Sequence, residues 1–398
     1  MLVLRAHVYF DERTIGGRSC ARRVHRRRAG WRDPIERGAM ATSTYDETRA
    51  EAFAERMLDM LNSGALMVMA SVGHRAGLFD ALAETGAATS TELAGAAGLD
   101  ERYVREWLGA MTAGRIVEID PQTGRFALPP EHAAWLTRAA SPDNLAVEAQ
   151  WITSLSTVED DIVECFRHGG GVSYERYARF HEVMAEESAQ TVLSVLFSHI
   201  LPLVPGMTER LEEGANLLDL GCGRGRALVV LAERFPKSTF LGYDLSADAI
   251  AFATAQAAER GLENVRFEAR DLSTFDADAE PEAFAYVTTF DAVHDQARPL
   301  ALLRGIRRTI RPDGVYLMQD IQGSSHVHEN VDHPGGPLLY MVSCMHCMTV
   351  SLAQGGEGLG AMWGEQKARE LLAEASFDSV EVHLLEHDPF NAYFVVRP

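Results

Sequence analysis

A glycine-rich loop holds the first residues suited to chemistry. Gly221, Gly223 and Gly225 alternate in the stretch at 218–225, after a predicted strand and before a predicted helix. Glycine lets the backbone turn tightly and approach a ligand closely. Asp244 ends the next predicted strand, where a carboxylate can accept hydrogen bonds from both ribose hydroxyls of a nucleoside. This order predicts a nucleoside site at the edge of a parallel sheet.

The glycine spacing and the nearby acids distinguish between classes of nucleotide. Gly-x-Gly-x-Gly differs from the Gly-x-Gly-x-x-Gly loop of dinucleotide-binding proteins, and the sequence has no Gly-x-x-x-x-Gly-Lys-Ser/Thr phosphate loop. Asp219 adds a carboxylate that would repel a pyrophosphate but suits a cationic amino-acid group. Asp271 follows the third predicted strand and can reach an adenine edge. We interpret Cys222, inside the loop, as a small packed residue rather than a nucleophile.

A histidine follows the fourth predicted strand, residues 286–290. His294 stands at the carboxyl edge, where ligands bind in open α/β sheets. Because imidazole gains and loses a proton near neutral pH, His294 is suited to act as a general base that removes a proton from a bound substrate. The alternative is a histidine with a structural role, or one that lines the cofactor.

A long segment rich in histidine and cysteine, residues 321–364, separates the fifth predicted strand from the last predicted helix. It is too long for a bare connector, and such insertions often cover an active site. We therefore expect a lid over a substrate pocket, lined by Tyr340, Met345, His346 and Trp363. A metal site is a second interpretation, because Cys344 and Cys347 form half of a zinc pattern that lacks a second cysteine pair. Two further interpretations remain. The thiols could bind arsenic or another thiophilic element, or these residues could simply pack in the core.

The C-terminal half supplies the elements that position these residues. Short apolar runs alternate with helical patterns from Asn216 onward, which is typical of βαβ units and a parallel sheet. A turn is expected at 388–391, between the last two strands. The predicted strands are 216–220, 239–244, 265–270, 286–290, 315–319, 380–385 and 393–397.

The N-terminal half is predicted to be mainly helical. Apolar residues recur at helical spacing over residues 45–83, a face typical of a core or a subunit interface. Residues 89–128 fit two helices followed by a β-hairpin, which is the pattern of a winged helix. On its second helix two glutamates offset two arginines, so it offers no basic face for phosphates. We therefore expect a structural or dimerising role rather than DNA binding.

Composition limits the classes of function. The chain has 398 residues, 46% of them apolar, with a net charge of −20 and a pI near 5.1, values that suit a globular protein and disfavour nucleic-acid binding. Its five scattered cysteines do not form a disulfide framework, so we expect a cytoplasmic location. The longest apolar run, 65–72, is too short to span a bilayer. The arginine-rich residues 1–39 are expected to be a disordered extension before a natural start at Met40, with a transit peptide as the weaker alternative.

Taken together, the C-terminal motifs resemble those of class I S-adenosylmethionine (SAM) methyltransferases. Residues 219–225, Asp244 and Asp271 are similar to that family's three successive cofactor motifs, and 311–314 to the lead-in to its fifth strand. The resemblance implies a Rossmann-like seven-stranded sheet that binds SAM and releases S-adenosylhomocysteine. It implies that Asp219 faces the amino group of SAM, Asp244 the ribose and Asp271 the adenine. The residues that it places against the cofactor are Asp219, Gly221, Cys222, Gly223, Gly225, Asp244, Leu245, Asp271, Leu272 and Phe290.

Two further stretches resemble the winged-helix O-methyltransferases. His294-Asp295-Gln296 is similar to a His-Asp-Trp stretch whose histidine is the base, although Gln296 replaces the tryptophan. Residues 180–188 are similar to a Phe-x-x-x-Met-x-x-x-Ser helix that covers the cofactor, which extends the resemblance to most of 45–398. In this region the residues expected to line the substrate pocket are Tyr174, Phe180, His181 and Met184.

We therefore predict a SAM-dependent methyltransferase with three parts: an extension (1–39), a helical winged-helix domain that dimerises and closes the pocket (40–210), and a SAM-binding Rossmann-like domain (211–398) with a lid at 321–364. The acceptor is expected to be a small, partly apolar molecule, methylated on oxygen, with nitrogen or sulfur next. We expect a homodimer formed through the N-terminal helices, with no nucleic acid, membrane or metal bound. A winged-helix regulator that responds to SAM or a metabolite, and a catalytically silent binding protein, are the alternatives.

Overall fold

The computed structural model describes residues 45–398, so the expectations for residues 1–39 and for a start at Met40 lie outside the described residues. The described residues fall into two units, residues 45–54 and the compact unit 55–398. The first described element is helix α1 (Glu47–Arg75). The candidate site lies within the second unit.

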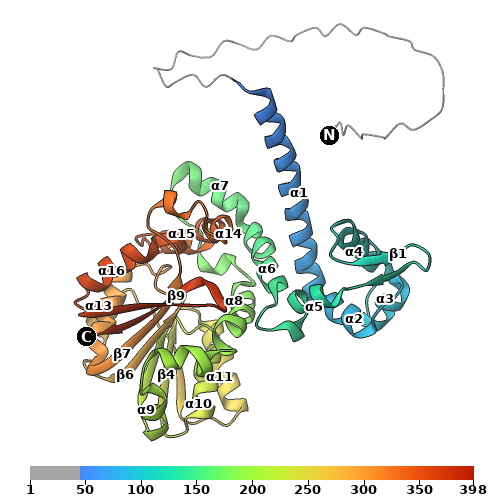
Figure 1. The fold of residues 1–398 in the computed structure, drawn as a ribbon. Coiled ribbons are helices and arrows are strands. Elements are labelled where there is room, and N and C mark those ends of the chain that lie inside the picture. The colour runs from blue at the N-terminus through green and yellow to red at the C-terminus, as the bar shows by residue number, and fades with distance from the viewer. Residues whose placement is uncertain (1–44) are drawn as a thin grey trace, which may run out of the picture. The chain divides into compact units, whose positions relative to one another are not determined.

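A winged helix forms the N-terminal part of the second unit, as predicted (Figure 1). Thr89 and Glu92 exchange hydrogen bonds in a capping box that begins α3. The Asp100 side chain caps α4 by accepting from the backbone of Arg102. The elements of this part after α1 are α2 (Leu78–Thr85), α3 (Ser90–Ala97), α4 (Glu101–Ala113), β1 (Glu118–Asp120), β2 (Arg125–Ala127) and α5 (Pro130–Leu136).

A group of helices connects the winged helix to the sheet. Helix α8 begins only at Phe180, because Tyr177 before it leaves the helical conformation, with φ −100° and ψ 72°. The helices are α6 (Leu145–Leu155), α7 (Glu159–His168), α8 (Phe180–Ser188) and α9 (Met207–Glu213). Single 3₁₀ or π turns stand between them: η1 (Arg138–Ala140), η2 (Ser156–Val158), η3 (Tyr174–Arg176), η4 (Ala189–Leu193), η5 (Leu196–Ile200) and η6 (Leu201–Leu203).

The C-terminal part is a seven-stranded sheet in the order β5-β4-β3-β6-β7-β9-β8. All neighbouring strands from β5 to β7 are parallel, while β9 runs antiparallel to both β7 and β8. The chain order reverses between β3 and β6, and ligands bind beyond the carboxyl ends of strands at such a point. The strands are β3 (Asn216–Leu220), β4 (Thr239–Asp244), β5 (Val265–Ala269), β6 (Phe284–Phe290), β7 (Ile310–Ile321), β8 (Ser379–Leu385) and β9 (Asp388–Arg397).

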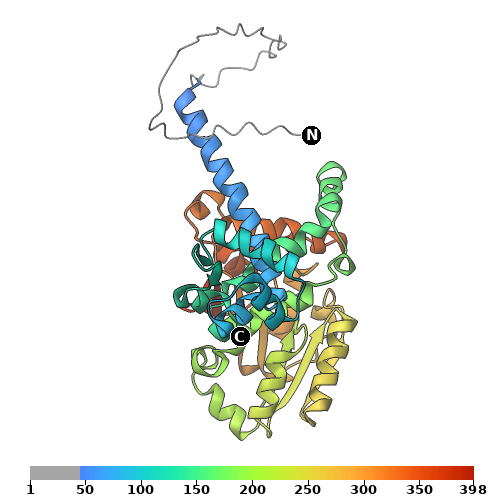
Figure 2. The ribbon, with the colours of Figure 1, turned by 90° about the vertical axis from the view of Figure 1, so that its right-hand side faces the viewer.

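Helices cover both faces of this sheet (Figure 2). In β3, Leu217 packs into one apolar core and Leu218 and Leu220 into the other, because successive side chains of a strand point to opposite faces. One core is shared with α9, α10 and α11, and the other with α12, α13 and α16. The helices not yet bounded are α10 (Arg226–Arg234), α11 (Ala247–Glu259), α12 (Phe275–Asp278), α13 (Pro299–Thr309) and α16 (Gly364–Glu374).

The last hairpin differs from the sequence expectation. The turn predicted at 388–391 belongs to β9, and a two-residue turn at 386–387 closes the hairpin instead. Asp388 sits in a strand because its carboxylate is buried and accepts hydrogen bonds from Gln319, Asn391 and Tyr393. The turn prediction was wrong because buried hydrogen-bond donors satisfy the Asp388 carboxylate, so this residue does not need the water that an exposed turn would provide.

The segment between β7 and α16 is largely helical. It contains η7 (Val327–Asn330), α14 (Gly336–Val342), a π turn η8 (Ser343–Cys347), α15 (Met348–Ala353) and η9 (Ala361–Trp363). The continuous run Gly336–Ala353 is long and apolar enough to cross a membrane by length and composition alone, and less than half of it is buried. Polar residues interrupt this run, so it does not stand out in the sequence as an unbroken apolar stretch.

Candidate functional site

The glycine-rich loop turns at the carboxyl end of β3. The backbone N–H groups of Gly221 and Cys222 donate to the carbonyl of Tyr243 on β4 at 2.8 and 3.0 Å, which holds the loop against the sheet. Gly221 has a φ of 76°, and a Cβ there would lie 2.4 Å from the Cβ of Ala292. A side chain at this position would therefore clash with the loop after β6 as well as strain the backbone.

Asp244 is fixed by the same loop. Its two carboxylate oxygens accept hydrogen bonds from the N–H groups of Gly223 and Ser246, each at 2.8 Å. The carboxylate lines a crevice together with Gly221 and Gly223. The predicted residues that line this crevice are Tyr174, Phe180, His181, Met184, Gly221, Gly223, Asp244, Leu245, Asp271, Leu272 and Phe290.

Three predicted cofactor residues lie outside this crevice. Asp219 and Cys222 line a neighbouring pocket, reached on the Arg226 side of the loop. Asp219 is buried and accepts a hydrogen bond from the Thr288 hydroxyl at 2.7 Å, and burial raises the pKa of its carboxyl group to about 7. Gly225 packs against the ring of Phe267, where a Cβ would lie 2.4 Å from the nearest ring atom.

A second cavity adjoins the crevice, and we call it the acceptor chamber. Phe180, Met184, Asp291 and Asp295 line both cavities, so the two share a wall. The other walls come from α6, the start of β9 and the helical segment that includes α14 and η8. On α8, positions 180, 184 and 187 all line the chamber, because residues at this spacing share one helix face.

His294 lies in this chamber and is paired with a carboxylate. Its Nδ1 atom lies 2.7 Å from Oδ1 of Asp320, and both side chains are buried. The same oxygen accepts from the Trp363 indole N–H at 2.9 Å, which fixes the carboxylate. Burial opposes protonation of His294, but the Asp320 charge and the Cys347 thiol outweigh it and raise the pKa of His294 well above its ordinary value.

His346 also lines the chamber, but the pKa of its ring is shifted in the opposite direction to that of His294. Its ring is fully buried, stacks on Phe180 at 3.8 Å between centroids, and has no hydrogen-bond partner for either nitrogen among the described residues. Burial, followed by the nearby His294 and His181, lowers the pKa of His346 to about 3. The ring is therefore neutral and offers one lone pair and one N–H group.

The other predicted lid residues lie away from both cavities. The Tyr340 hydroxyl accepts a hydrogen bond from Asn330, and the Met345 carbonyl accepts one from the Tyr177 hydroxyl at 2.6 Å. Trp363 reaches the site only through Asp320. Within residues 45–398 one group of three possible metal ligands comes together, namely Asp291, His294 and Asp320, and neither Cys344 nor Cys347 belongs to it.

Known families match both halves of the chain. Residues 64–138 match the model of the Rv2258c-like winged HTH domain, and residues 211–376 match that of a methyltransferase domain. The chain therefore carries a winged HTH domain followed by a methyltransferase domain. Both domains agree with the resemblance that the sequence motifs indicate.

Individual relatives agree with this assignment over part of their length. A fatty-acid O-methyltransferase of Mycolicibacterium smegmatis is 33% identical over 108 residues, 27% of this chain and 38% of that protein. A 2-heptyl-1-hydroxyquinolin-4(1H)-one methyltransferase of Mycobacteroides abscessus is 34% identical over 110 residues, 27% of this chain and 45% of that protein. The chain therefore spans less than half the length of each. Human N-acetylserotonin methyltransferase, solved with SAM, shares the fold, with a TM-score of 0.62, 17% identity, and coverage of 90% of this chain and 99% of that one.

The crevice fits SAM, the cofactor that the methyltransferase domain implies. The bare backbone at Gly221 leaves space that a side chain would fill. Asp291, with a φ of 49°, turns into the crevice and its buried Oδ1 atom has no protein partner among the described residues. Asp244, Asp271 and Asp295 add further acids, and an acidic crevice suits the sulfonium and amino charges of SAM.

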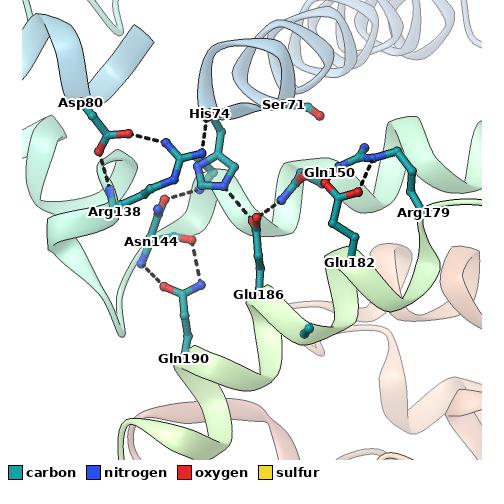
Figure 3. A network of polar contacts seen from close by, with 12 residues as sticks. Ser71, His74, Asp80, Arg138, Asn144, Gln150, Arg179, Glu182, Glu186 and Gln190 are labelled. Atoms are coloured by element: carbon teal, nitrogen blue, oxygen red, sulfur yellow. Dashed lines mark hydrogen bonds and ion pairs between the residues drawn. The ribbon is translucent and has the colours of Figure 1, made fainter. Parts of the chain in front are cut away.

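A polar network holds helix α8 from behind (Figure 3). Nε2 of His74, near the end of α1, lies 2.9 Å from the Glu186 carboxylate on α8, which also accepts from Gln150 on α6 at 2.8 Å. Gln150 in turn accepts from Arg179 at 2.9 Å. The face of α8 opposite the cavities is thereby tied to both the winged helix and α6.

Sequence reasoning missed several residues of the site. Asp320 is the second-last residue of β7, the strand beside β6, so its place at the carboxyl edge was a usable signal. Asp291 likewise follows β6 directly. Glu148 and Glu187 also line the chamber, but acids on predicted helices resemble ordinary surface residues, and no sequence signal separates them.

Proposed function

We propose that this protein transfers the methyl group of SAM to a small, partly apolar acceptor. Oxygen is the favoured acceptor atom, and nitrogen and sulfur are the alternatives. The shared wall between crevice and chamber carries this proposal, because an acceptor in the chamber would lie next to a cofactor in the crevice. Such alignment of two reactants supplies much of the rate in a displacement reaction.

Different residues of the crevice would bind different parts of the cofactor. In this proposal Asp244 binds the ribose hydroxyls, Asp271 and Leu272 the adenine, and the loop at 221–223 passes beneath the methionine part. Asp219, in the pocket behind the loop, acts on the amino group through water or through the loop itself. Bound SAM supplies a methyl carbon already activated by its sulfonium.

His294 is the proposed general base. Asp320 holds its Nδ1 atom, which leaves Nε2 to accept a proton from the acceptor. Because the pKa of His294 is raised, its neutral ring is a stronger base than an ordinary histidine. Turnover should therefore rise as the pH increases through the pKa of His294.

A winged-helix regulator is the alternative function. On α4, Arg102 pairs with Glu106 and Arg105 with Glu101. These ion pairs favour an enzyme over a DNA-binding regulator, because arginines already paired with acids bind DNA phosphates weakly.

The N-terminal helix favours a homodimer. Apolar side chains of α1 are exposed in the single chain, including Met57, Leu58, Leu61, Val68 and Val72. We propose that this face pairs with a second copy. Leu61→Glu should shift the wild-type dimer to monomer in analytical ultracentrifugation, and a monomeric wild type would contradict the proposal.

The deciding experiment is calorimetric titration of the full chain with S-adenosylhomocysteine. Wild type should bind it at micromolar concentration, and Asp244→Ala should lose this binding. Phenols, amines and thiols are then screened with methyl-labelled SAM. Failure of the wild type to bind the cofactor product would reject the methyltransferase proposal.

A further inference from the structure

Two carboxyl groups line the acceptor chamber without lining the cofactor crevice. Glu148 comes from α6 and Glu187 from α8. The Trp151 indole N–H donates to Glu187 at 2.8 Å. Within residues 45–398, Glu148 has no hydrogen-bond donor and Glu187 has no other, so both groups keep free lone pairs.

The chamber contains no matching positive charge. No lysine or arginine among the described residues lines it. His294 is already paired with Asp320, and the buried His346 is neutral. Burial and then Asp388 raise the pKa of Glu148 to about 7, and burial and then Glu148 raise that of Glu187 well above its ordinary value. The two acids therefore lack a cation that would let both ionise.

In the proposed function the cofactor would not supply this cation. Its charged groups would lie in the crevice, where Asp291 and Asp295 are available on the shared wall. Glu148 and Glu187 lie on the acceptor side only. Their natural counter-ion is therefore part of the acceptor.

We propose, building on the methyltransferase function above, that the acceptor carries a basic amine whose ammonium group binds between Glu148 and Glu187. Its apolar body packs against Trp151 and Phe180, and a separate nucleophilic group reaches His294. An ammonium N–H bound to a carboxylate forms the strong, charge-assisted class of hydrogen bond.

His346 supplies an independent observation for a polar ligand. Its ring is fully buried with both nitrogens unpartnered among the described residues, and it lines the same chamber. Buried polar atoms are nearly always satisfied in a working state. A neutral imidazole can accept a hydrogen bond from an amine or hydroxyl of the acceptor.

Three phenols of similar size test the charge preference. The full chain, saturated with S-adenosylhomocysteine, is titrated with tyramine, para-ethylphenol and phloretic acid, which are cationic, neutral and anionic. Tyramine should bind about tenfold or more tightly than para-ethylphenol, the scale of a hydrogen bond to a charged group, and phloretic acid most weakly. Equal or stronger binding of the neutral or anionic phenol, or no binding of tyramine, overturns the inference.

Matched variants locate the preference. Glu148→Gln and Glu187→Gln should each reduce the tyramine preference about tenfold, while Glu213→Gln, an exposed acid at the end of α9, should keep it. Retention of the preference in both chamber variants would reject the two carboxylates as the amine site. The first titration separates the proposals, because loss of S-adenosylhomocysteine binding rejects the function, whereas loss of the amine preference alone rejects only this inference.

Discussion

The cofactor crevice and the acceptor chamber share a wall but are built in opposite ways. The crevice takes most of its polar contacts from short loops that follow β3, β4, β5 and β6, and backbone N–H groups fix its acids. The chamber is assembled from side chains of α6, α8, α14 and η8 together with β9. A site made of backbone is encoded locally and tolerates little change, whereas a site made of distant side chains can be altered one residue at a time.

The largest expected effect is at Gly221, because it breaks the crevice alone. Gly221→Ala places a Cβ 2.4 Å from Ala292 and strains a φ of 76°, so S-adenosylhomocysteine affinity should fall more than about 100-fold, the loss that follows when a binding loop is displaced. Calorimetry measures it. Gly109→Ala, on α4 with open space around its Cβ, is the control and should bind normally.

Asp320 tests the chamber without touching the crevice. Asp320→Asn removes the charge that raises the pKa of His294, so turnover should fall about 100-fold or more, while S-adenosylhomocysteine affinity stays the same. The rise of turnover with pH should also move to lower pH. A histidine NMR titration follows the His294 pKa directly, and an unchanged titration would contradict the pairing.

His346 sharpens the comparison by separating stability from function. His346→Leu removes two buried, unpartnered nitrogens, so the free energy of unfolding should increase by about 1 kcal/mol, although acceptor affinity should fall. Urea unfolding gives the first quantity and titration with tyramine the second. A variant that is both less stable and normal in binding would show that the imidazole has partners in the native state.

The smallest expected effect concerns the support of the shared wall. Glu186→Gln weakens the contact with His74, and because Glu186 is partly exposed the loss should be below about 1 kcal/mol. The hydrogen bond from His74 lowers the pKa of Glu186 below its ordinary 4.5, so its contribution is present above pH 4.5 and is lost as the pH falls. Unfolding at pH 7 should separate variant from wild type more than at pH 3. Glu175→Gln, an exposed acid outside the network, should show no such difference.

Part of the crevice could be predicted from the sequence because strand, loop and acid are neighbours in the chain. Gly221, Gly223 and Asp244 line it in the predicted order, whereas Gly225 packs against Phe267. The sheet followed from the alternation of strands and helices. The chamber could not be predicted this way, since Glu148, Glu187 and Asp320 meet only in the folded chain. Trp363 shows the same limit of sequence reasoning. It was expected to line the pocket, yet its indole N–H donates a hydrogen bond to Asp320 instead.

The position of α8 has a thermodynamic consequence. Phe180 and Met184 face both cavities, so any adjustment of these side chains on cofactor binding also changes the space that an acceptor meets. The affinities for the two ligands are then linked, and linkage between two bound ligands is reciprocal. If the cofactor strengthens acceptor binding by some factor, the acceptor strengthens cofactor binding by the same factor, and exchange of spent for fresh cofactor depends on whether the chamber is filled.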